Sequence, residues 1–204
     1  METSVRPARI NKEALRRSIQ RKYREVATDP DKGFHFHTGY PLAAMLGYRS
    51  EELGHLPAAN VSSFAGTGNP FAMGRLREGE AVLDVGCGSG VDTLLAALQV
   101  GPSGSVVAID MTQEMLERTA AGAAAMGLSN VVTHLAFAES LPVDDACIDV
   151  VISNGVLNLT PDKEAVMREI WRVLKPGGRV QMADIVVHRP IDEKAKENIE
   201  LWSG

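Results

Sequence analysis

Cysteine is scarce in this sequence. Cys87 and Cys147 are the two cysteines among 204 residues, and their spacing matches no disulfide framework of a small secreted domain. Stable disulfides form mainly in oxidising compartments, so a chain this poor in cysteine is expected to work in a reducing one. We therefore expect a cytoplasmic protein.

Long apolar runs and a basic charge are also lacking. No run of about 18 apolar residues is present, and no apolar segment with a cleavage site follows the N-terminus, so neither a membrane span nor a secretory signal is predicted. The formal net charge of −5 repels phosphate backbones, which argues against nucleic acid as a partner. A small molecule is the expected substrate, no membrane is expected as a partner, and the oligomeric state stays open.

The composition that is present is that of a globular protein. Hydrophobic residues make up 45% and charged residues 23% of the chain, a balance that fits one domain with a short extension. We divide the chain into an N-terminal helix with a cap, residues 1–72, and a ligand-binding domain, residues 73–204. Residues 11–26 are predicted to form an amphipathic helix with Asn11 as its N-cap.

The segment 27–72 is richer in glycine, proline, serine and asparagine than the rest of the chain. Such composition is typical of connecting segments that run over the surface. We interpret it as a mobile cap over a site, outside the core.

Short apolar runs alternate with helical patterns from about Gly79 onward. Strands are predicted at 81–85, 105–110, 131–136, 148–153 and 179–187. Helices are predicted at 91–99, 112–127, 160–174 and 191–202, with Thr160 and Pro161 as N-cap and first residue of the third. The alternation predicts a mostly parallel sheet covered on both faces, a Rossmann-like three-layer α/β/α fold with an N-terminal helical cap.

A glycine-rich loop carries the chemistry. The segment Asp84-Val85-Gly86-Cys87-Gly88-Ser89-Gly90 follows the first predicted strand and opens a helix, where free backbone N–H groups bind anionic groups. Asp110 ends the next strand, twenty residues after Gly90, where a carboxylate can accept the hydroxyls of a ribose. The two features together predict a ligand that contains adenosine.

The kind of ligand follows from the loop itself. Nicotinamide cofactors prefer G-x-G-x-x-G with a pyrophosphate on the helix N-terminus, whereas this loop reads G-x-G-x-G and carries Asp84 before it. A carboxylate there repels a pyrophosphate but can orient an ammonium group, directly or through water. S-adenosylmethionine, which has an ammonium group, a carboxylate and a ribose but no phosphate, fits better than a nicotinamide dinucleotide. The alternative is a purely structural role, in which the glycine turn packs the helix on the strand and binds no ligand.

The sequence resembles the class I methyltransferases over residues 75–187. The resemblance is carried by V-L-D-V-G-C-G-S-G, by Asp110, and by L-K-P-G-G-R at 174–179. It implies a seven-stranded sheet that holds S-adenosylmethionine over the glycine loop. Residues 188–204 are too few for two more strands, so we expect the C-terminal strands to be missing.

A narrower resemblance, over residues 33–204, is to arsenite methyltransferases. It is carried by F-H-T-G at 36–39, S-F-A-G-T-G-N-P-F at 63–71, D-M-T-Q-E-M-L at 110–116 and I-S-N-G-V-L-N-L-T-P-D-K at 152–163. That family holds trivalent arsenic with cysteine thiolates, and soft metals need such ligands. Here Gly155 stands where the family has cysteine, and neither Cys87 nor Cys147 matches a family ligand position.

Further site residues are expected from strand ends and from the resemblance. Met111, Ala138 and Glu139 are candidates to lie along the adenine, and Asn154 to line the site where the reactive methyl points. Residues that could cover the cofactor or contact the substrate are Tyr23, His35, His37 and Asn158. The cofactor-binding set is completed by Asp84, Gly86, Cys87, Gly88, Gly90 and Asp110.

No metal site is expected, because His35 and His37 stand alone without further ligands. Methyl transfer from a sulfonium needs alignment and exclusion of water more than a base, so no catalytic residue is assigned. The sequence thus predicts an S-adenosylmethionine-dependent methyltransferase that acts on a small molecule and is similar to arsenite methyltransferases. Two alternatives stay open: methylation of a carbon, oxygen or nitrogen centre in another metabolite, and non-catalytic binding of S-adenosylmethionine.

Overall fold

A parallel β-sheet forms the centre of the molecule. The computed structural model describes residues 11–188, 198–199 and 202, and within these the sheet has five strands in the order β3-β2-β1-β4-β5. The strands are β1 (Ala81–Val85), β2 (Ser105–Asp110), β3 (Val131–Leu135), β4 (Ile148–Asn154) and β5 (Leu174–Ala183). All four neighbouring pairs are parallel. This confirms the predicted Rossmann-like sheet.

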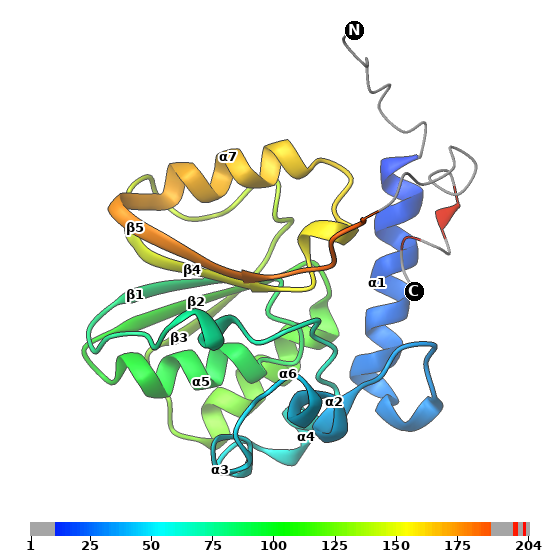
Figure 1. Cartoon of the computed structure of the whole chain (residues 1–204), viewed down its shortest axis with the longest axis horizontal. Coiled ribbons are helices and arrows are strands. Elements are labelled where there is room, and N and C mark those ends of the chain that lie inside the picture. The colour runs from blue at the N-terminus through cyan, green and yellow to red at the C-terminus, as the bar shows by residue number, and fades with distance from the viewer. Residues whose placement is uncertain (1–10, 189–197, 200–201, 203–204) are drawn as a thin grey trace, which may run out of the picture.

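Helices cover both faces of the sheet, which gives three layers (Figure 1). The helices are α1 (Lys12–Thr28), α2 (Gly39–Met45), α3 (Ser50–Gly54), α4 (Ala58–Ser62), α5 (Val91–Val100), α6 (Gln113–Ala125) and α7 (Lys163–Val173). Short 3₁₀ turns are η1 (Pro30–Lys32), η2 (Pro70–Met73) and η3 (Leu157–Leu159). Helix α7 packs on one face of the sheet, and α5 and α6 on the other.

The two faces of β1 explain why its sequence is apolar almost throughout. Leu83 and Val85 lie in a buried cluster with Val166 and Ile170 of α7, whereas Val82 lies in a separate cluster with α5. Successive side chains of a strand point to opposite faces, so a strand buried on both sides needs apolar residues at nearly every position. Asp84 is the exception, and its environment is described below.

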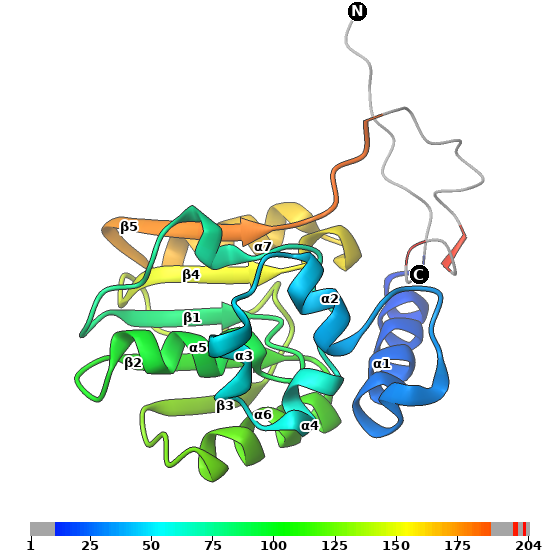
Figure 2. The same cartoon turned by 60° about the horizontal axis from the view of Figure 1, so that its bottom comes forward.

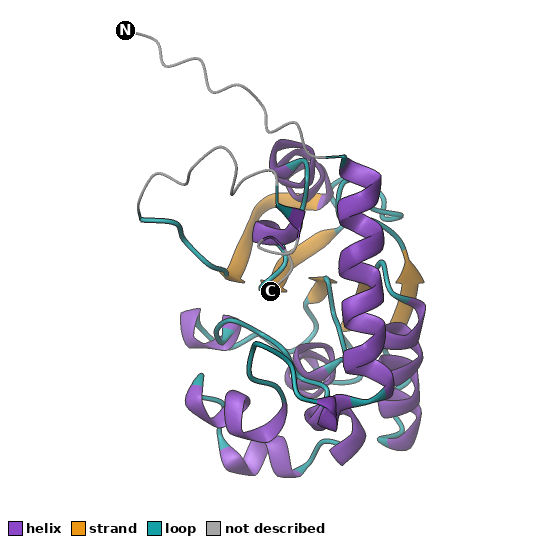
Figure 3. Cartoon of the chain, turned by 90° about the vertical axis from the view of Figure 1, so that its right-hand side faces the viewer, coloured by secondary structure: helices purple, strands orange, loops and turns teal. Residues whose placement is uncertain are grey.

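Helix α1 stands at the carboxyl ends of the strands. The arrowheads of β1, β4 and β5 point toward it in Figure 2, and Figure 3 shows it from that side. Its buried residues Leu15, Ile19 and Val26 recur at helical spacing, and the Asn11 side chain accepts a hydrogen bond from the Ala14 N–H at 3.0 Å. The predicted helix and its N-cap are confirmed.

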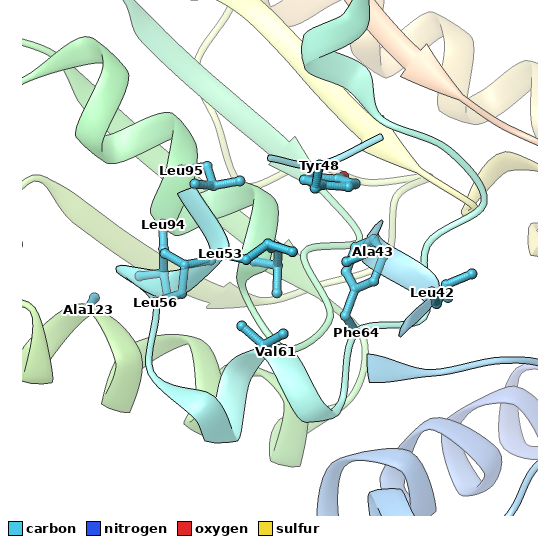
Figure 4. Packing of buried hydrophobic residues seen from close by; sticks show 11 residues of the cluster. Leu42, Ala43, Tyr48, Leu53, Leu56, Val61, Phe64, Leu94, Leu95 and Ala123 are labelled. Carbon is cyan, nitrogen blue, oxygen red and sulfur yellow. The ribbon is translucent and has the colours of Figure 1, made fainter. Parts of the chain in front are cut away.

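The cap segment is packed into the protein, so the prediction that it lies outside the core is wrong. Leu42, Leu53, Val61 and Phe64 form a buried cluster with residues of α5, as Figure 4 shows. The short helices α2, α3 and α4 have seven, five and five residues, which is too few for a helical period to be recognised in the sequence.

The boundaries of α7 and β5 also differ from the prediction, and β5 begins at Leu174 where position 179 was predicted. Helix α7 begins at Lys163, because the Asp162 carboxylate accepts a hydrogen bond from the Ala165 N–H at 3.1 Å and so acts as N-cap in place of Thr160. Strand β5 ends at Ala183, and residues 184–188 continue without strand structure. The helix predicted at 191–202 falls mostly outside the described residues.

No helix in the described part of the chain combines the length and the apolar character that crossing a bilayer requires.

Candidate functional site

A cleft opens at the carboxyl ends of the strands, between α1, the cap and the sheet. It encloses about 950 Å³, including the part that is open to solvent. Its walls come from α1, from residues 63–66 of the cap, from the loop after β1, and from the segments that follow β2, β3 and β4. In a sheet of order β3-β2-β1-β4-β5 the strands after β1 are added first on one side of it and then on the other, and ligands bind at such a switch point.

The glycine loop forms the floor of this cleft. The Gly86 and Cys87 N–H groups donate to the Ile109 carbonyl at 2.7 and 2.9 Å, which fixes the loop against β2. Gly88 has φ +54°, and a Cβ added there would meet nothing within 4 Å, so its backbone lies bare toward the cleft. A ligand can therefore approach this backbone closely, which a side chain would prevent.

Gly90 has a different position from the other two glycines. It lies outside the cleft lining, and a Cβ on it would come within 2.7 Å of the Thr119 hydroxyl on α6. Its φ of +90° lets the chain turn into α5 while α6 packs against the turn. The structure thus gives Gly90 a packing environment, whereas Gly86, Cys87 and Gly88 line the cleft.

Asp110 lies on the cleft wall at the tip of β2. Its carboxylate accepts hydrogen bonds from the Gly88 N–H at 2.9 Å and from the Thr112 N–H at 2.8 Å. Burial raises the pKa of this carboxyl, and the Thr112 and Gly88 N–H groups work in the opposite direction. Because the carboxylate also lies on the cleft lining, it can accept from hydroxyls of a ligand.

The wall beyond Asp110 is made by the predicted residues Met111, Ala138 and Glu139, all on the lining. Glu139 forms an ion pair of 2.8 Å with Arg16 of α1, a residue that was not among the predicted site residues. The Arg16 guanidinium carbon also lies 4.6 Å from the centre of the Phe137 ring. Arg16 directly follows the buried Leu15 on α1. Its position beside the apolar stripe was the one indication in the sequence that it could lie at the edge of the cleft.

Asn154, at the tip of β4, holds the cap to the sheet. Its side-chain oxygen accepts from the Thr67 and Gly68 N–H groups at 2.8 and 3.1 Å. Its amide nitrogen lies 3.0 Å from Asp92 Oδ2 and 3.0 Å from the Tyr48 hydroxyl. The predicted site residue therefore lines the cleft and at the same time joins three segments.

Asp92 and Tyr48 are functional candidates that sequence reasoning missed. Asp92 lies in the first turn of α5, lines the cleft and is buried, and the Tyr48 hydroxyl donates to its Oδ1 at 2.5 Å. Burial raises the pKa of Asp92 to about 6, although the bonds from Tyr48 and Asn154 lower it. In sequence, an acid at this position has the ordinary explanation of a favourable charge at a helix start.

Asp84 lies behind the glycine loop, off the cleft lining. Its Oδ2 accepts from the Thr93 hydroxyl of α5 at 2.5 Å, and its side chain is buried. Burial, and then the charges of Asp92 and Asp110, raise the pKa of Asp84 well above its usual range. This placement does not fit the prediction that Asp84 contacts a ligand ammonium group directly.

Of the remaining candidates, the structure places one on the cleft lining and three away from it. Tyr23 of α1 lines the cleft, and burial, followed by the charges of Asp110 and Asp184, raises its pKa to about 12. His35 and His37 are exposed and away from the lining. Asn158 is also off the lining, and its N–H donates to Asp184 at 3.2 Å. Within the described residues, no three His, Cys, Asp or Glu side chains are grouped closely enough to hold a metal ion.

The thiols are not arranged as a soft-metal site. Cys87 lines the cleft, but burial raises its thiol pKa well above the usual range, and Cys147 lies off the lining. Gly155, where the resemblance places a cysteine, has φ +72°, and a Cβ there would lie 3.0 Å from Thr67 Cγ2. The described part of the cleft therefore offers a single thiol, held in its neutral form.

An open parallel sheet with a bare glycine loop at its switch point, and a carboxylate at the next strand tip, defines a nucleotide- or nucleoside-binding α/β protein. Residues 76–204 match the family model described as a methyltransferase domain, and the chain belongs to this family of class I, S-adenosylmethionine-dependent methyltransferases.

Relatives with a stated activity are also methyltransferases. The chain is 41% identical to the arsenite methyltransferase of Halobacterium salinarum over 162 residues, which are 76% of this chain and 41% of that protein. It is 40% identical to the arsenite methyltransferase of Aquipseudomonas alcaligenes over 134 residues, 62% of this chain and 39% of that protein. The chain thus spans about two fifths of the length of these relatives.

A solved structure has the same arrangement. An arsenic(III) S-adenosylmethionine methyltransferase from Chlamydomonas reinhardtii superposes with a TM-score of 0.60 at 35% identity. The superposition covers 78% of this chain and 53% of that one. The shared part therefore includes most of this chain and about half of the solved protein.

Proposed function

We propose that this chain binds S-adenosylmethionine in the cleft and forms the donor-binding part of a small-molecule methyltransferase related to the arsenite methyltransferases. One observation carries the proposal. The bare backbone of Gly88 and the carboxylate of Asp110 lie on one cleft and are joined by a hydrogen bond of 2.9 Å. The carboxylate can accept from the ribose hydroxyls of an amino-acid nucleoside, and the missing side chain at Gly88 lets such a ligand lie close against the loop.

The residues present fit this cofactor. A Cβ at Gly88 would meet no protein atom within 4 Å, so the loop leaves this space to a ligand. Asp110 would accept from the ribose hydroxyls, and Met111 and Ala138 would flank the adenine. The cleft is apolar around these polar groups, as small-molecule sites are.

The chemistry follows from positioning. When bound, S-adenosylmethionine supplies a methyl group that is already activated by a positively charged sulfur. The protein has to hold the donor and the acceptor in line and to exclude water. Here α1 closes one side, with Gln20 donating to the Met111 carbonyl at 2.7 Å and Arg16 paired with Glu139. Asn154 fixes the cap segment that closes the other side.

The acceptor is the open part of the proposal. The curated relatives named above are arsenite methyltransferases, which supports trivalent arsenic. In the described residues, however, Cys87 is the single thiol on the cleft, and glycine occupies position 155. This observation favours a second candidate function, methylation of a carbon, oxygen or nitrogen centre in another metabolite. The low cysteine content and net charge of −5 support action on a small molecule in the cytoplasm.

Binding of the donor is tested by calorimetric titration of S-adenosylmethionine into the wild-type chain and into Asp110→Ala. Removing the carboxylate deletes charge-assisted hydrogen bonds worth roughly 1.5–3 kcal/mol, so affinity should fall about 10- to 100-fold. Asp144→Asn, an exposed site with the same change of charge, should bind as the wild type does. Equal affinity of Asp110→Ala and wild type would contradict the assignment of Asp110.

The acceptor is tested with arsenite and a thiol in a labelled-methyl assay on the same chain. We expect no methylated arsenic, because one buried neutral thiol cannot replace a set of thiolates. Methylated arsenic from the wild-type chain would instead favour the first acceptor over the second. If the chain binds the donor but transfers its methyl group to no acceptor tested, the remaining hypothesis is a non-catalytic protein that binds S-adenosylmethionine.

A further inference from the structure

Asp92 is a buried carboxylate that faces the cleft and has no cationic partner among the described residues. It is 6% exposed, and no ion pair found in the described part of the chain includes it. Its two oxygens accept from the neutral Tyr48 hydroxyl and the neutral Asn154 amide. Burying an unpaired carboxylate is costly, and buried charges in proteins are normally paired. The arrangement therefore leaves a place for a positive charge from a ligand.

The other two buried acids near the loop are occupied differently. Asp84 lies behind the loop against the Thr93 hydroxyl and does not reach the cleft lining. Asp110 is bonded to the backbone N–H groups of Gly88 and Thr112, at the ribose end of the site. Asp92 is thus the acid on the lining that lies at the start of α5, on the side of the cleft where Asn154 ends β4.

We propose that Asp92 is the carboxylate that binds a cationic nitrogen of the ligand, with Tyr48 and Asn154 as its positioning residues. The inference rests on the proposed function, and in S-adenosylmethionine the nitrogen is the ammonium group of the methionine part. It replaces the sequence-based assignment of this role to Asp84.

The electrostatics separate the two acids in the same way. The charges of Asp92 and Asp110 add to the burial that raises the pKa of Asp84, which favours a protonated, neutral Asp84. Burial raises the pKa of Asp92 to about 6, and the bonds from Tyr48 and Asn154 limit this rise. At neutral pH Asp92 therefore holds the negative charge that an ammonium group needs.

The positioning residues come from separate parts of the chain. Tyr48 follows α2 in the cap, and its ring packs edge-on against Phe64 with 5.2 Å between the ring centres. Asn154 ends β4, and its amide lies within 3.0 Å of both Tyr48 and Asp92. A cation bound at Asp92 would thus be held where cap and sheet meet.

The test uses three ligands that differ in charge. S-adenosylmethionine has an ammonium and a sulfonium group, S-adenosylhomocysteine has only the ammonium group, and 5′-methylthioadenosine has neither. Each is titrated calorimetrically at pH 7 into wild type, Asp92→Asn and the charge control Asp144→Asn. We expect Asp92→Asn to weaken the two ammonium ligands roughly 10- to 100-fold and 5′-methylthioadenosine less than about threefold.

The outcomes are distinguishable. Equal weakening of all three ligands would show that Asp92 has a structural role. Weaker binding of S-adenosylmethionine alone would place the sulfonium group at Asp92, and unchanged binding of every ligand would show that Asp92 contacts none of them. Each of these three outcomes overturns the inference. A wild-type chain that binds none of the three overturns the proposed function itself. Asp144→Asn should match wild type throughout.

A pH series keeps the proposal testable if Asp92→Asn folds poorly. The titratable groups that face Asp92 are Tyr48 and Asp84, while Asn154 and Thr93 are neutral. Wild-type affinity for S-adenosylhomocysteine should fall about tenfold per pH unit below the pKa of Asp92 and level off above it. In Tyr48→Phe the midpoint should move to higher pH, because a donor to the charged form is lost. An unchanged midpoint in Tyr48→Phe would overturn the arrangement.

Discussion

The individual glycines of the loop are required for different reasons, although the sequence presents them as one motif. Gly86 has φ +74° and faces Val156, so an alanine there is strained by its backbone and by a clash of 2.3 Å with Val156 Cγ2. Gly88 also has positive φ, yet its Cβ would meet nothing within 4 Å. The first position is restricted by packing, and the second by the space that a ligand needs.

This contrast predicts that two alanine substitutions affect mainly different properties, stability at Gly86 and ligand binding at Gly88. Gly86→Ala should lower the free energy of unfolding by about 2–4 kcal/mol, since overpacking adds to the cost of a left-handed conformation. Gly88→Ala should cost about 1 kcal/mol, from φ alone, but weaken S-adenosylmethionine more than its stability effect implies. Urea denaturation and calorimetric titration measure the two quantities. A Gly88→Ala protein that binds normally would show that the loop backbone is not approached.

Among acidic residues, sequence reasoning placed Asp110 on what is the cleft wall in the structure, whereas Asp84, predicted to orient a ligand directly or through water, lies off the cleft lining. The tip of a parallel strand is fixed by the length of its apolar run, so Asp110 could be located without coordinates. Whether Asp84 faced a ligand depended on Thr93 of α5 lying opposite it, a tertiary contact that no local pattern shows. The same holds for Asp92, whose partner Tyr48 is 44 positions away.

Among secondary-structure elements, the strands and long helices of residues 81–173 could be predicted because their apolar periods extend over a turn or more. The cap could not, because α3 and α4 have five residues each and depend on contacts with α5. Proline and glycine at 176–178 predict the end of a helix, and α7 does end before them, at Val173. Strand β5, however, begins at Leu174, where position 179 was predicted. The register against β4 passes from the Ile148/Leu174 pair to the Val150/Arg179 pair, so residues 175–178 form an irregularity that no local pattern assigns to a strand.

Helix α1 is attached to the wall of the cleft by polar contacts at its exposed edge and by apolar contacts beneath. Leu15 and Ile19 are fully buried, whereas Arg16 and Gln20 bridge to Glu139 and to the Met111 carbonyl. The apolar contacts stabilise the helix in place. The polar ones close the cleft on the side where the adenine is expected.

We therefore expect the double variant Arg16→Ala/Gln20→Ala to release ligand faster while remaining folded. Arg16 and Glu139 are partly buried, and an ion pair or hydrogen bond of this kind contributes about 1 kcal/mol, so the free energy of unfolding should fall by roughly 1–2 kcal/mol. The dissociation rate of S-adenosylhomocysteine, measured by stopped flow, should rise several-fold, with Arg17→Ala as a control on the exposed face. An unchanged dissociation rate would mean that α1 does not limit exit.

At the scale of the whole molecule, the three buried acids Asp84, Asp92 and Asp110 lie around one loop, and burial raises the pKa of each. Several exposed or partly exposed acids behave oppositely, because Arg179 lowers the pKa of Glu80 and Arg172 that of Glu169. The pH dependence of stability is the sum of both groups, so a single variant is needed to separate the buried contribution.

Asp92→Asn isolates it in the ligand-free protein. The pKa of Asp92 is about 6 when folded against 3.8 unfolded, so its contribution is present below pH 4 and is lost as the pH rises to about 6. The difference in unfolding free energy between wild type and variant should therefore shift against the wild type by about 3 kcal/mol across that window and stay level above it. Urea denaturation at intervals between pH 4 and about 8 measures the difference. If the wild type instead loses stability relative to the variant as the pH falls, the Asp92 anion is stabilised in the ligand-free protein. The protein would then already supply the positive charge that we propose comes from the ligand.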